Sequence, residues 1–256
     1  TTGNYNAAVG QGALGANTTG GDNTAMGVGT LAANTTANSN TAFGRASLNG
    51  NTTGANNTAV GAETLTANTT GGVNVAMGRY ALHGNTTGNN NTAIGYSALQ
   101  AADSSYNTAI GRGALGSTTT GYSNVGLGYD AQSSSATAIG QCTLGDTNIV
   151  NLRCNDTSIS SLSDSRDKTD VIDSPYGLDF INTVRPVQFL WDTRDGNIKD
   201  GTTRIGFLAQ ELLAACEGEN AVLDLVMDDN PDKLEAKYSN LLPIMVQAIQ
   251  ELSTQN

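Results

Sequence analysis

The stretch "SLSDSRDK" near the middle of the chain contains two side chains that can take part in nucleophilic chemistry, Ser163 and Lys168, although their spacing alone does not define a site. A serine hydroxyl is a weak nucleophile, and it attacks a carbonyl carbon only when a base takes its proton. The one histidine, His83, lies far away in the sequence, and a lysine amine is another side chain that can act as a base. Such an amine accepts a proton only in its neutral form, which burial or nearby positive charge favours.

The residues around this pair bear on the same chemistry. Arg166 is close enough in sequence to supply positive charge, whereas Asp164 and Asp167 would oppose it and are expected to point elsewhere. Because Ser163 and Lys168 are five residues apart, a turn, a bulge or packing between chains must bring them together. The alternative interpretation is a solvated linker with an Asp–Lys surface pair.

The stretch lies at a boundary between two compositions. Residues 163–256 hold 8 of the 12 Lys and Arg residues and 17 of the 23 Asp and Glu residues, whereas 26 of the 31 glycines precede Ser163. We therefore predict three parts: a repeat domain at 1–145, a β neck with linker at 146–162, and a C-terminal domain at 163–256.

Charge and motifs argue against several classes of function. The net charge of −11 argues against a nucleic-acid partner, and no apolar run is long enough for membrane insertion. The first residues lack the features of a signal peptide. The three cysteines have no metal-ligand spacing, and two G-x-G-x-x-G matches belong to a repeat rather than to a strand–helix unit. We expect no metal and no cofactor.

The first part of the chain is a repeat, as in "NTAMGVGTL", "NTAIGYSAL" and "NTAIGRGAL". Spacings between the anchoring glycines are 17 residues, except for 16 before Gly111 and 12 before Gly140. Each unit has an apolar residue before the glycine and, in most units, a leucine four residues after it. The anchoring glycines are Gly10, Gly27, Gly44, Gly61, Gly78, Gly95, Gly111, Gly128 and Gly140.

Such short units cannot bury their apolar side chains alone, whereas stacked coils can do so through ladders of like residues. The density of Gly, Asn and Thr disfavours helix, and we predict a β-roll of nine coils, roughly 40 Å long. Because the apolar content of each coil is low, we expect further burial against symmetry-related chains. Surface aromatics such as Tyr80, Tyr96, Tyr122 and Tyr129 either bind glycans or pack at the rim.

The motif "NTAIGYSAL" resembles the head repeats of trimeric autotransporter adhesins and similar repeats in phage tail fibres. That resemblance implies a left-handed parallel β-roll that associates as a homotrimer. It specifies no ligand.

The sequence after Lys168 predicts a small α+β domain. "SPYGLDFINTV" indicates a helix capped by Ser174, "PVQFLWD" a strand, and "RIGFLAQELLAAC" a strand followed by a helix. "AVLDLVMDD" indicates another strand. The last helix, "SNLLPIMVQAIQEL", has a short seam that faces either its own domain or two other chains. The seam residues follow 4-3-4 spacing: Leu241, Met245, Ala248 and Leu252.

The motifs "SDSRDK", "PVQFLW", "RIGFLAQEL" and the terminal helix resemble the intramolecular chaperone domain of phage tail spikes and fibres, of which the endosialidase spike is one case. The resemblance implies a domain that drives trimer assembly and then cuts itself off with a serine–lysine dyad. Its pattern, Ser-Asp-x-Arg-x-Lys, corresponds to Ser163, Asp164, Arg166 and Lys168. The implied single-turnover cut is at the Leu162–Ser163 bond, with Ser163 as nucleophile and Lys168 as base.

The sequence thus predicts the trimeric tail fibre or spike of a virion, fused to a self-cleaving chaperone with no activity on external substrates. The alternative is a receptor- or glycan-binding head with a passive C-terminal trimer clamp. A trimeric autotransporter is a weaker third interpretation, because the sequence shows no pattern of membrane β-strands.

Overall fold

The computed structural model describes residues 2–146, 149, 163–192 and 201–255. The chain divides into two compact units, residues 1–146 and 147–256. Apart from Asp146 and residue 149, the predicted neck at 146–162 lies outside the described residues, and so does the "DGNIK" segment.

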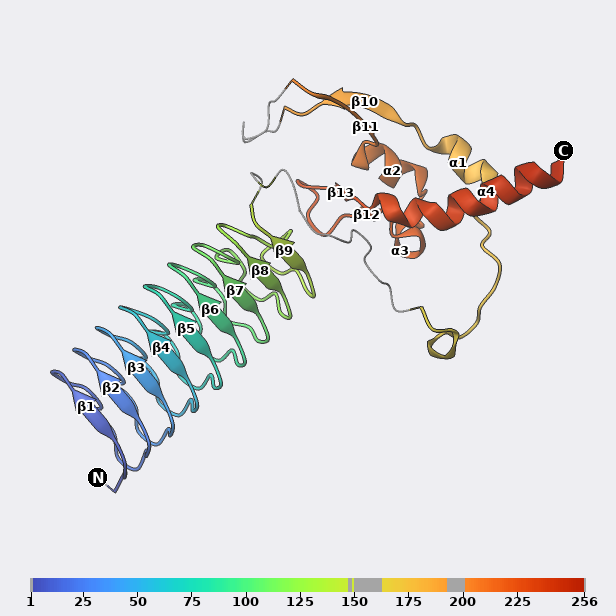
Figure 1. Ribbon diagram of the computed structural model, residues 1–256. Helices are drawn as coiled ribbons and strands as arrows, with labels where there is room; N and C mark the ends of the chain where they lie inside the picture. The colour runs from blue at the N-terminus through green and yellow to red at the C-terminus, as the bar shows by residue number, and fades with distance from the viewer. Residues whose placement is uncertain (1, 147–148, 150–162, 193–200, 256) are drawn as a thin grey trace, which may run out of the picture. The chain divides into compact units, whose positions relative to one another are not determined.

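The N-terminal unit is a β-solenoid whose coils each contribute one three-residue strand to a single parallel sheet (Figure 1). Within the described residues the sheet has nine strands in chain order, which corresponds to about eight complete coils. The part of each coil around its leucine consists of turns rather than a second strand. The strands are β1 Ala7–Val9, β2 Thr24–Met26, β3 Thr41–Phe43, β4 Thr58–Val60, β5 Val75–Met77, β6 Thr92–Ile94, β7 Thr108–Ile110, β8 Val125–Leu127 and β9 Cys142–Leu144.

The solenoid core consists of stacked identical side chains, as the sequence predicted. The middle residue of strands β2–β7 is a fully buried alanine, and the leucine of each of these coils is also fully buried. Two asparagine ladders run beside them; for example, Asn57 N–H donates to Asn40 Oδ1 at 2.9 Å, and Asn68 Nδ2 donates to Asn51 Oδ1 at 2.7 Å. Because each buried amide is bonded to the next coil, the ladders fix the register of the stack.

The apolar residue before each anchoring glycine faces outward, which the sequence interpretation did not foresee. It is the third residue of its strand, on the face opposite the buried alanine, because successive side chains alternate across a strand. Strand pairing aligns these residues in register, and several of them are 38–60% exposed. We call this column the outer ladder: Val9, Met26, Phe43, Val60, Met77, Ile94, Ile110, Leu127 and Leu144.

The last coil corrects the predicted ninth repeat. Its strand is Cys142–Leu144 and its corner glycine is Gly145, so the 17-residue spacing from Gly128 is kept. The residues around Gly140 form the preceding turn, and Ile139 is exposed. The asparagine ladder explains the register, because Gln141 N–H donates to Asn124 Oδ1 at 2.9 Å.

The 16-residue coil contains a local compensation. One threonine of the "NTT" turn is missing there, and Asp103 accepts hydrogen bonds from Thr86 N–H at 3.0 Å and Thr87 N–H at 2.8 Å. Partial burial raises the pKa of the Asp103 carboxyl, but the hydrogen bonds from Thr86, Thr87 and Gly88 outweigh it, so the pKa lies below 3.8. The carboxylate thus replaces the carbonyl that a full-length coil presents.

The same coil interrupts one asparagine ladder and yields a stability prediction. Asn85 Oδ1 is buried without a hydrogen-bond partner, because the next coil has Ala102 where the ladder would continue with asparagine. We expect Ala102→Asn to raise the free energy of unfolding by about 1 kcal/mol, since it supplies the missing donor. Denaturant unfolding measures this change. Ala101→Asn, at the adjacent exposed position, is the control and should be close to neutral.

The C-terminal unit is a small α+β arrangement around one cluster of buried residues. Its helices are η1 Ser165–Asp167, α1 Leu178–Thr183, α2 Ala209–Ala215, α3 Asn220–Leu223, η2 Tyr238–Asn240 and α4 Leu241–Gln255. Strands β10 Val187–Leu190 and β11 Thr203–Gly206 pair antiparallel, as do β12 Val226–Met227 and β13 Glu235–Ala236. The core side chains are Leu212, Cys216, Leu223, Leu225, Val226, Leu241 and Ile244.

Two predicted boundaries in this unit were wrong. Helix α1 begins at Leu178 rather than beside Ser174, because its first N–H donates to Glu251 Oε2 of α4 at 2.8 Å. That carboxylate packs against Gly177, where a Cβ would be 2.1 Å from Glu251 Oε1. The segment predicted as a single strand begins as α3, and the side chain of Asn220 bonds both N–H and C=O of Val226.

Helix α4 divides the predicted seam between two environments. Leu241 and Ala248 are buried in their own unit together with Ile244, whereas Met245 and Leu252 are exposed. The exposed pair lies in line with two further apolar residues at 3-4-3 spacing. We call these four residues the α4 stripe: Leu242, Met245, Ile249 and Leu252, which are 44–63% exposed.

Across the described parts of the chain, no helix is both long enough and apolar enough to span a membrane. Likewise, no group of three or more His, Cys, Asp or Glu side chains among those residues is placed to hold a metal ion.

Candidate active site

The structure brings together the serine and lysine that the sequence singled out. Lys168 Nζ donates a hydrogen bond to Ser163 Oγ at 2.6 Å. The single 3-10 turn η1 makes this possible, because it folds the chain back between the two residues. A turn within one chain is therefore sufficient for the contact, and packing between chains is not needed to form it.

Asp164 and Arg166 build the turn that positions this pair. The Asp164 carboxylate is the N-cap of η1: it accepts Arg166 N–H at 2.9 Å and Arg166 Nε at 3.0 Å, and it also pairs with Nη2. The sequence analysis expected Arg166 to supply positive charge beside Lys168. Instead the guanidinium is paired with Asp164, which also keeps that carboxylate bound away from the lysine amine.

All residues from Ser163 to Asp170 are exposed in the single chain. Leu162, whose carbonyl carbon the serine would attack, lies outside the described residues. The structure therefore describes the Ser163 hydroxyl and the Lys168 amine beside it, whereas the carbonyl side of the predicted cut lies outside the described residues.

The Asp164–Arg166 pair has a pH signature. Arg166, through its side chain and then its backbone N–H, lowers the pKa of the Asp164 carboxyl below 3.8. Because the pKa is lowered, the contribution of the pair to the turn is complete above pH 3.8 and is lost as the pH falls through the lowered value. An NMR titration of the Asp164 carboxyl carbon should have its midpoint below 3.8 in Ser163→Ala, and Arg166→Gln should raise that midpoint. Equal midpoints in the two proteins would contradict the pairing.

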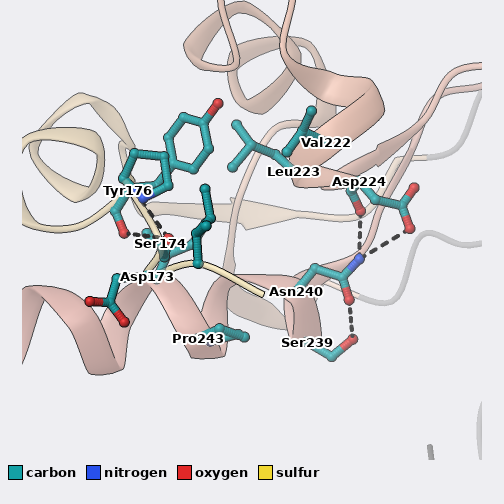
Figure 2. A pocket seen from close by; sticks show the side chains of 12 residues that line it. Asp173, Ser174, Tyr176, Val222, Leu223, Asp224, Ser239, Asn240 and Pro243 are labelled. Atoms are coloured by element: carbon teal, nitrogen blue, oxygen red, sulfur yellow. Dashed lines mark hydrogen bonds between the residues drawn. The ribbon is translucent and has the colours of Figure 1, made fainter. Parts of the chain in front are cut away.

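A second feature of this unit is a surface hollow of about 570 Å³ between residues 172–176, the end of α3 and the start of α4 (Figure 2). Figure 2 shows Asn240 pointing toward Asp224, to whose carbonyl oxygen it donates at 2.7 Å. Lys237 Nζ also donates to Asp224, at 2.6 Å. Neither Ser163 nor Lys168 lines the hollow.

Comparison with known families places this site in context. Residues 163–223 match the family described as chaperone of endosialidase, and the match begins at Ser163. It ends at Leu223, so the resemblance that the sequence analysis extended to the C-terminus is matched only in its first part. No curated protein and no solved structure matches the chain.

The match and the fold agree on the layout of the chain. A parallel solenoid of coils of about 17 residues ends near Asp146, and a small α+β unit with a long C-terminal helix follows the junction. This is the order of parts that the tail-fibre resemblance predicted. The chain is thus a β-solenoid followed, from Ser163, by a segment of the chaperone-of-endosialidase type.

Proposed function

We propose that residues 163–256 form an intramolecular chaperone that assembles three copies of the chain and then releases itself by cutting the Leu162–Ser163 bond. The product would be a solenoid fibre or spike of a viral tail, assembled in the host cytoplasm and carried in the virion. The family match supports the chaperone role. The observation that carries the cleavage is the 2.6 Å contact between Ser163 Oγ and Lys168 Nζ at the first residue of the matched segment.

The reaction we propose is an acyl shift followed by hydrolysis. The Ser163 hydroxyl attacks the carbonyl carbon of Leu162 while the neutral amine of Lys168 takes the hydroxyl proton. Collapse of the tetrahedral intermediate breaks the C–N bond, leaving Leu162 esterified to Ser163 Oγ and a free amine at Ser163. Water then hydrolyses the ester, which gives a carboxylate at Leu162 and restores the hydroxyl. The nucleophile attacks its own preceding carbonyl, so each chain reacts once.

Exposure of the dyad suggests when the reaction takes place. A lysine amine acts as a base only when neutral, and burial favours the neutral form. Because Ser163 and Lys168 are exposed in the single chain, we infer that other chains must cover them before cleavage begins. Assembly would then come first and release second, which is the order that a chaperone requires.

Two exposed apolar surfaces support association between copies of the chain. The outer ladder runs the length of the solenoid, and each copy has the same ladder with the same coil spacing. A contiguous apolar surface of this kind is uncommon on a monomer and usually marks an interface. The α4 stripe repeats at 3-4-3 spacing, which is the spacing of a helix that packs against other helices. We therefore propose that the trimer contact lies on the α4 stripe. Leu241 and Ala248, which belonged to the seam predicted from the sequence, are buried within their own unit instead.

The coupling of assembly to cleavage can be tested on the α4 stripe. We expect the double variant Leu242→Ser/Ile249→Ser to weaken the trimer about tenfold or more, because each position loses buried apolar area. Cleavage should slow in parallel. Light scattering coupled to size exclusion reports assembly, and a denaturing gel at timed intervals reports cleavage. Gln250→Ser, at an exposed polar position of the same helix, is the matched control. Full-rate cleavage in a monomeric double variant would refute the assembly requirement.

The second function that the sequence left open is receptor or glycan binding by the solenoid with a passive C-terminal clamp. The Ser163–Lys168 contact argues against a passive clamp. A group of arginine and tyrosine side chains on coils β5–β8 favours a binding role for the solenoid, which is compatible with release by cleavage.

A further inference from the structure

The cationic side chains of the solenoid are few and unevenly neutralised. Residues 1–146 contain three arginines and no lysine. Arg45 forms an ion pair with Glu63 of the next coil. Within the described residues, neither Arg79 nor Arg112 has a carboxylate partner at ion-pair distance. Two positive charges on an acidic chain therefore lack a counter-charge of their own.

These two arginines lie against tyrosine rings instead. The guanidinium of Arg79 is 4.4 Å from the centroid of Tyr80, and its Nη2 donates to the Tyr80 hydroxyl at 2.6 Å. Arg112 lies between two rings, 5.8 Å from Tyr96 and 5.4 Å from Tyr129, and donates to the Tyr129 hydroxyl at 3.1 Å. Tyr80 and Tyr96 are in edge-to-face contact at 6.0 Å. We call these five residues, Arg79, Tyr80, Tyr96, Arg112 and Tyr129, the Arg–Tyr face.

The solenoid backbone holds this face rigidly. Four of its residues follow the corner glycines of successive coils, and inter-coil hydrogen bonds fix them: the carbonyls of Arg79, Tyr96 and Arg112 accept from Ser97, Gly113 and Asp130. Tyr80 has a left-handed backbone with φ of 63°, as do Ala46, Glu63 and Ser97 at the equivalent position of neighbouring coils, so the solenoid turn fixes where its ring begins.

We propose that the Arg–Tyr face binds a linear anionic saccharide that runs along the solenoid axis. Arginine is suited to planar anions because its guanidinium donates two parallel N–H hydrogen bonds. Stacking on a tyrosine ring holds the guanidinium in one orientation before the anion binds. The electron-rich faces of exposed tyrosines attract the polarised C–H groups of a sugar ring. Arg79 and Arg112 are two coils apart, about 10 Å, so the face suits a chain with regularly repeated negative charges rather than a single ion.

The surroundings of the face are compatible with an anionic ligand. Of the net charge of −11, residues 1–162 carry only 4 − 6 = −2, so the solenoid itself repels an anionic chain weakly. The flanking carboxylates are already engaged, since Glu63 pairs with Arg45 and Asp130 accepts from Gln132 Nε2 at 2.9 Å. Tyr122, which the sequence grouped with these aromatics, has no ring contact with them among the described residues. The proposal does not depend on whether the C-terminal unit cleaves itself.

The test measures binding of the assembled full chain to oligosaccharides of galacturonate, alginate and hyaluronan and to phosphorylated and sulfated oligosaccharides. Each probe is paired with its neutral parent, such as the carboxyl-reduced form. We expect at least one anionic series to bind, and its neutral parent to bind about tenfold or more weakly, as for the loss of charge-assisted hydrogen bonds. The series that binds identifies the anionic group. Inorganic tripolyphosphate is the probe without a sugar, and it should bind more weakly.

Variants connect the binding to these residues. Arg79→Gln/Arg112→Gln should abolish binding, and Tyr96→Ala/Tyr129→Ala should weaken it about tenfold, the loss expected for ring stacking. Arg45→Gln, in the same column but paired with Glu63, is the control and should bind as the parent chain does. Absence of binding to every anionic series, equal affinity for tripolyphosphate, or unchanged binding in the arginine double variant would overturn the proposal. Loss of the trimer in that variant would also overturn it, because the face would then be a contact between chains.

Discussion

Ser163→Ala is expected to give one full-length band on a denaturing gel, while the same protein still forms trimers under native conditions. The alanine removes the hydroxyl that contacts Lys168 Nζ at 2.6 Å, so no acyl shift can begin. It leaves the Asp164–Arg166 turn and the α4 stripe unchanged, because neither includes the Ser163 hydroxyl. The effect on cleavage should be complete rather than graded, since the proposed acyl shift uses only the Ser163 hydroxyl.

Lys168→Met should have the same effect, because it keeps the length of the side chain and removes the base. Lys233→Met is the matched control: Lys233 is also exposed, and it pairs with Glu235 at 3.2 Å, away from the motif. The control should be processed as the parent chain is. Cleavage that persists in Ser163→Ala would refute the nucleophile assignment, and normal processing of Lys168→Met would remove lysine from the mechanism.

The second large effect is expected at a corner of the solenoid. Gly27→Ala should lower the free energy of unfolding by about 3 kcal/mol or more, from backbone strain and overpacking together. Gly27 has φ of 138°, and a Cβ there would lie 2.6 Å from the carbonyl oxygen of Gly44 in the next coil. The glycine oxygen cannot move without breaking the coil stack. Hydrogen exchange of β2 and β3 should therefore be faster in the variant.

Gly29→Ala provides a control two residues away in the same coil. Its φ is 67°, and the nearest atom to an added Cβ is the flexible Asn49 side chain at 3.3 Å. The equivalent residue of the next coil, Ala46, has the same left-handed backbone with φ of 56°. We expect a loss of about 1–2 kcal/mol, the usual cost of a left-handed backbone for alanine, without the further loss from overpacking. Equal destabilisation by the two substitutions would show that close stacking of the corner glycines does not limit the solenoid.

The repeat made most of the solenoid predictable. Glycine and asparagine recur with the coil length, so the stack, the leucine column and the asparagine ladders follow from spacing alone. The repeat spacing did not show on which side of the strand the residue before each glycine lies. Both Ala59 and Val60 are apolar, and only the strand pairing shows that the alanine is inside while the valine is outside. The ninth repeat was misplaced at Gly140 because "ATAIGQCTL" resembles the repeat motif. A constant coil length of 17 residues from Gly128 places the corner at Gly145 instead.

The C-terminal unit was less predictable because long-range contacts determine its boundaries. Helix α1 begins where Glu251, far away in the sequence, bonds the N–H of Leu178. The heptad seam could not be resolved from spacing, since Leu241 and Leu242 are both apolar and only burial separates them. The serine–lysine pair was predicted from the resemblance of "SDSRDK" to the chaperone motif, whereas the pairing of Arg166 with Asp164 depends on the geometry of η1.

The position of η1 suggests why the junction combines a local turn with two exposed reactive side chains, Ser163 and Lys168. The Asp164–Arg166 pair is local and holds Ser163 and Lys168 together in a single chain. In the proposed reaction, the burial that makes the lysine a base comes from other chains. Such a site would form early and be activated late, which would keep the chaperone attached until assembly is complete.

The intact masses of the assembled, unmodified chain test the central claim most directly. We predict two species, one ending at Leu162 with a carboxylate and one beginning at Ser163 with a free amine. Hydroxylamine added during processing should convert part of the first species to a hydroxamate at Leu162, because it captures the ester. A single full-length mass in a fully assembled trimer, or a break at any other bond, would contradict the account.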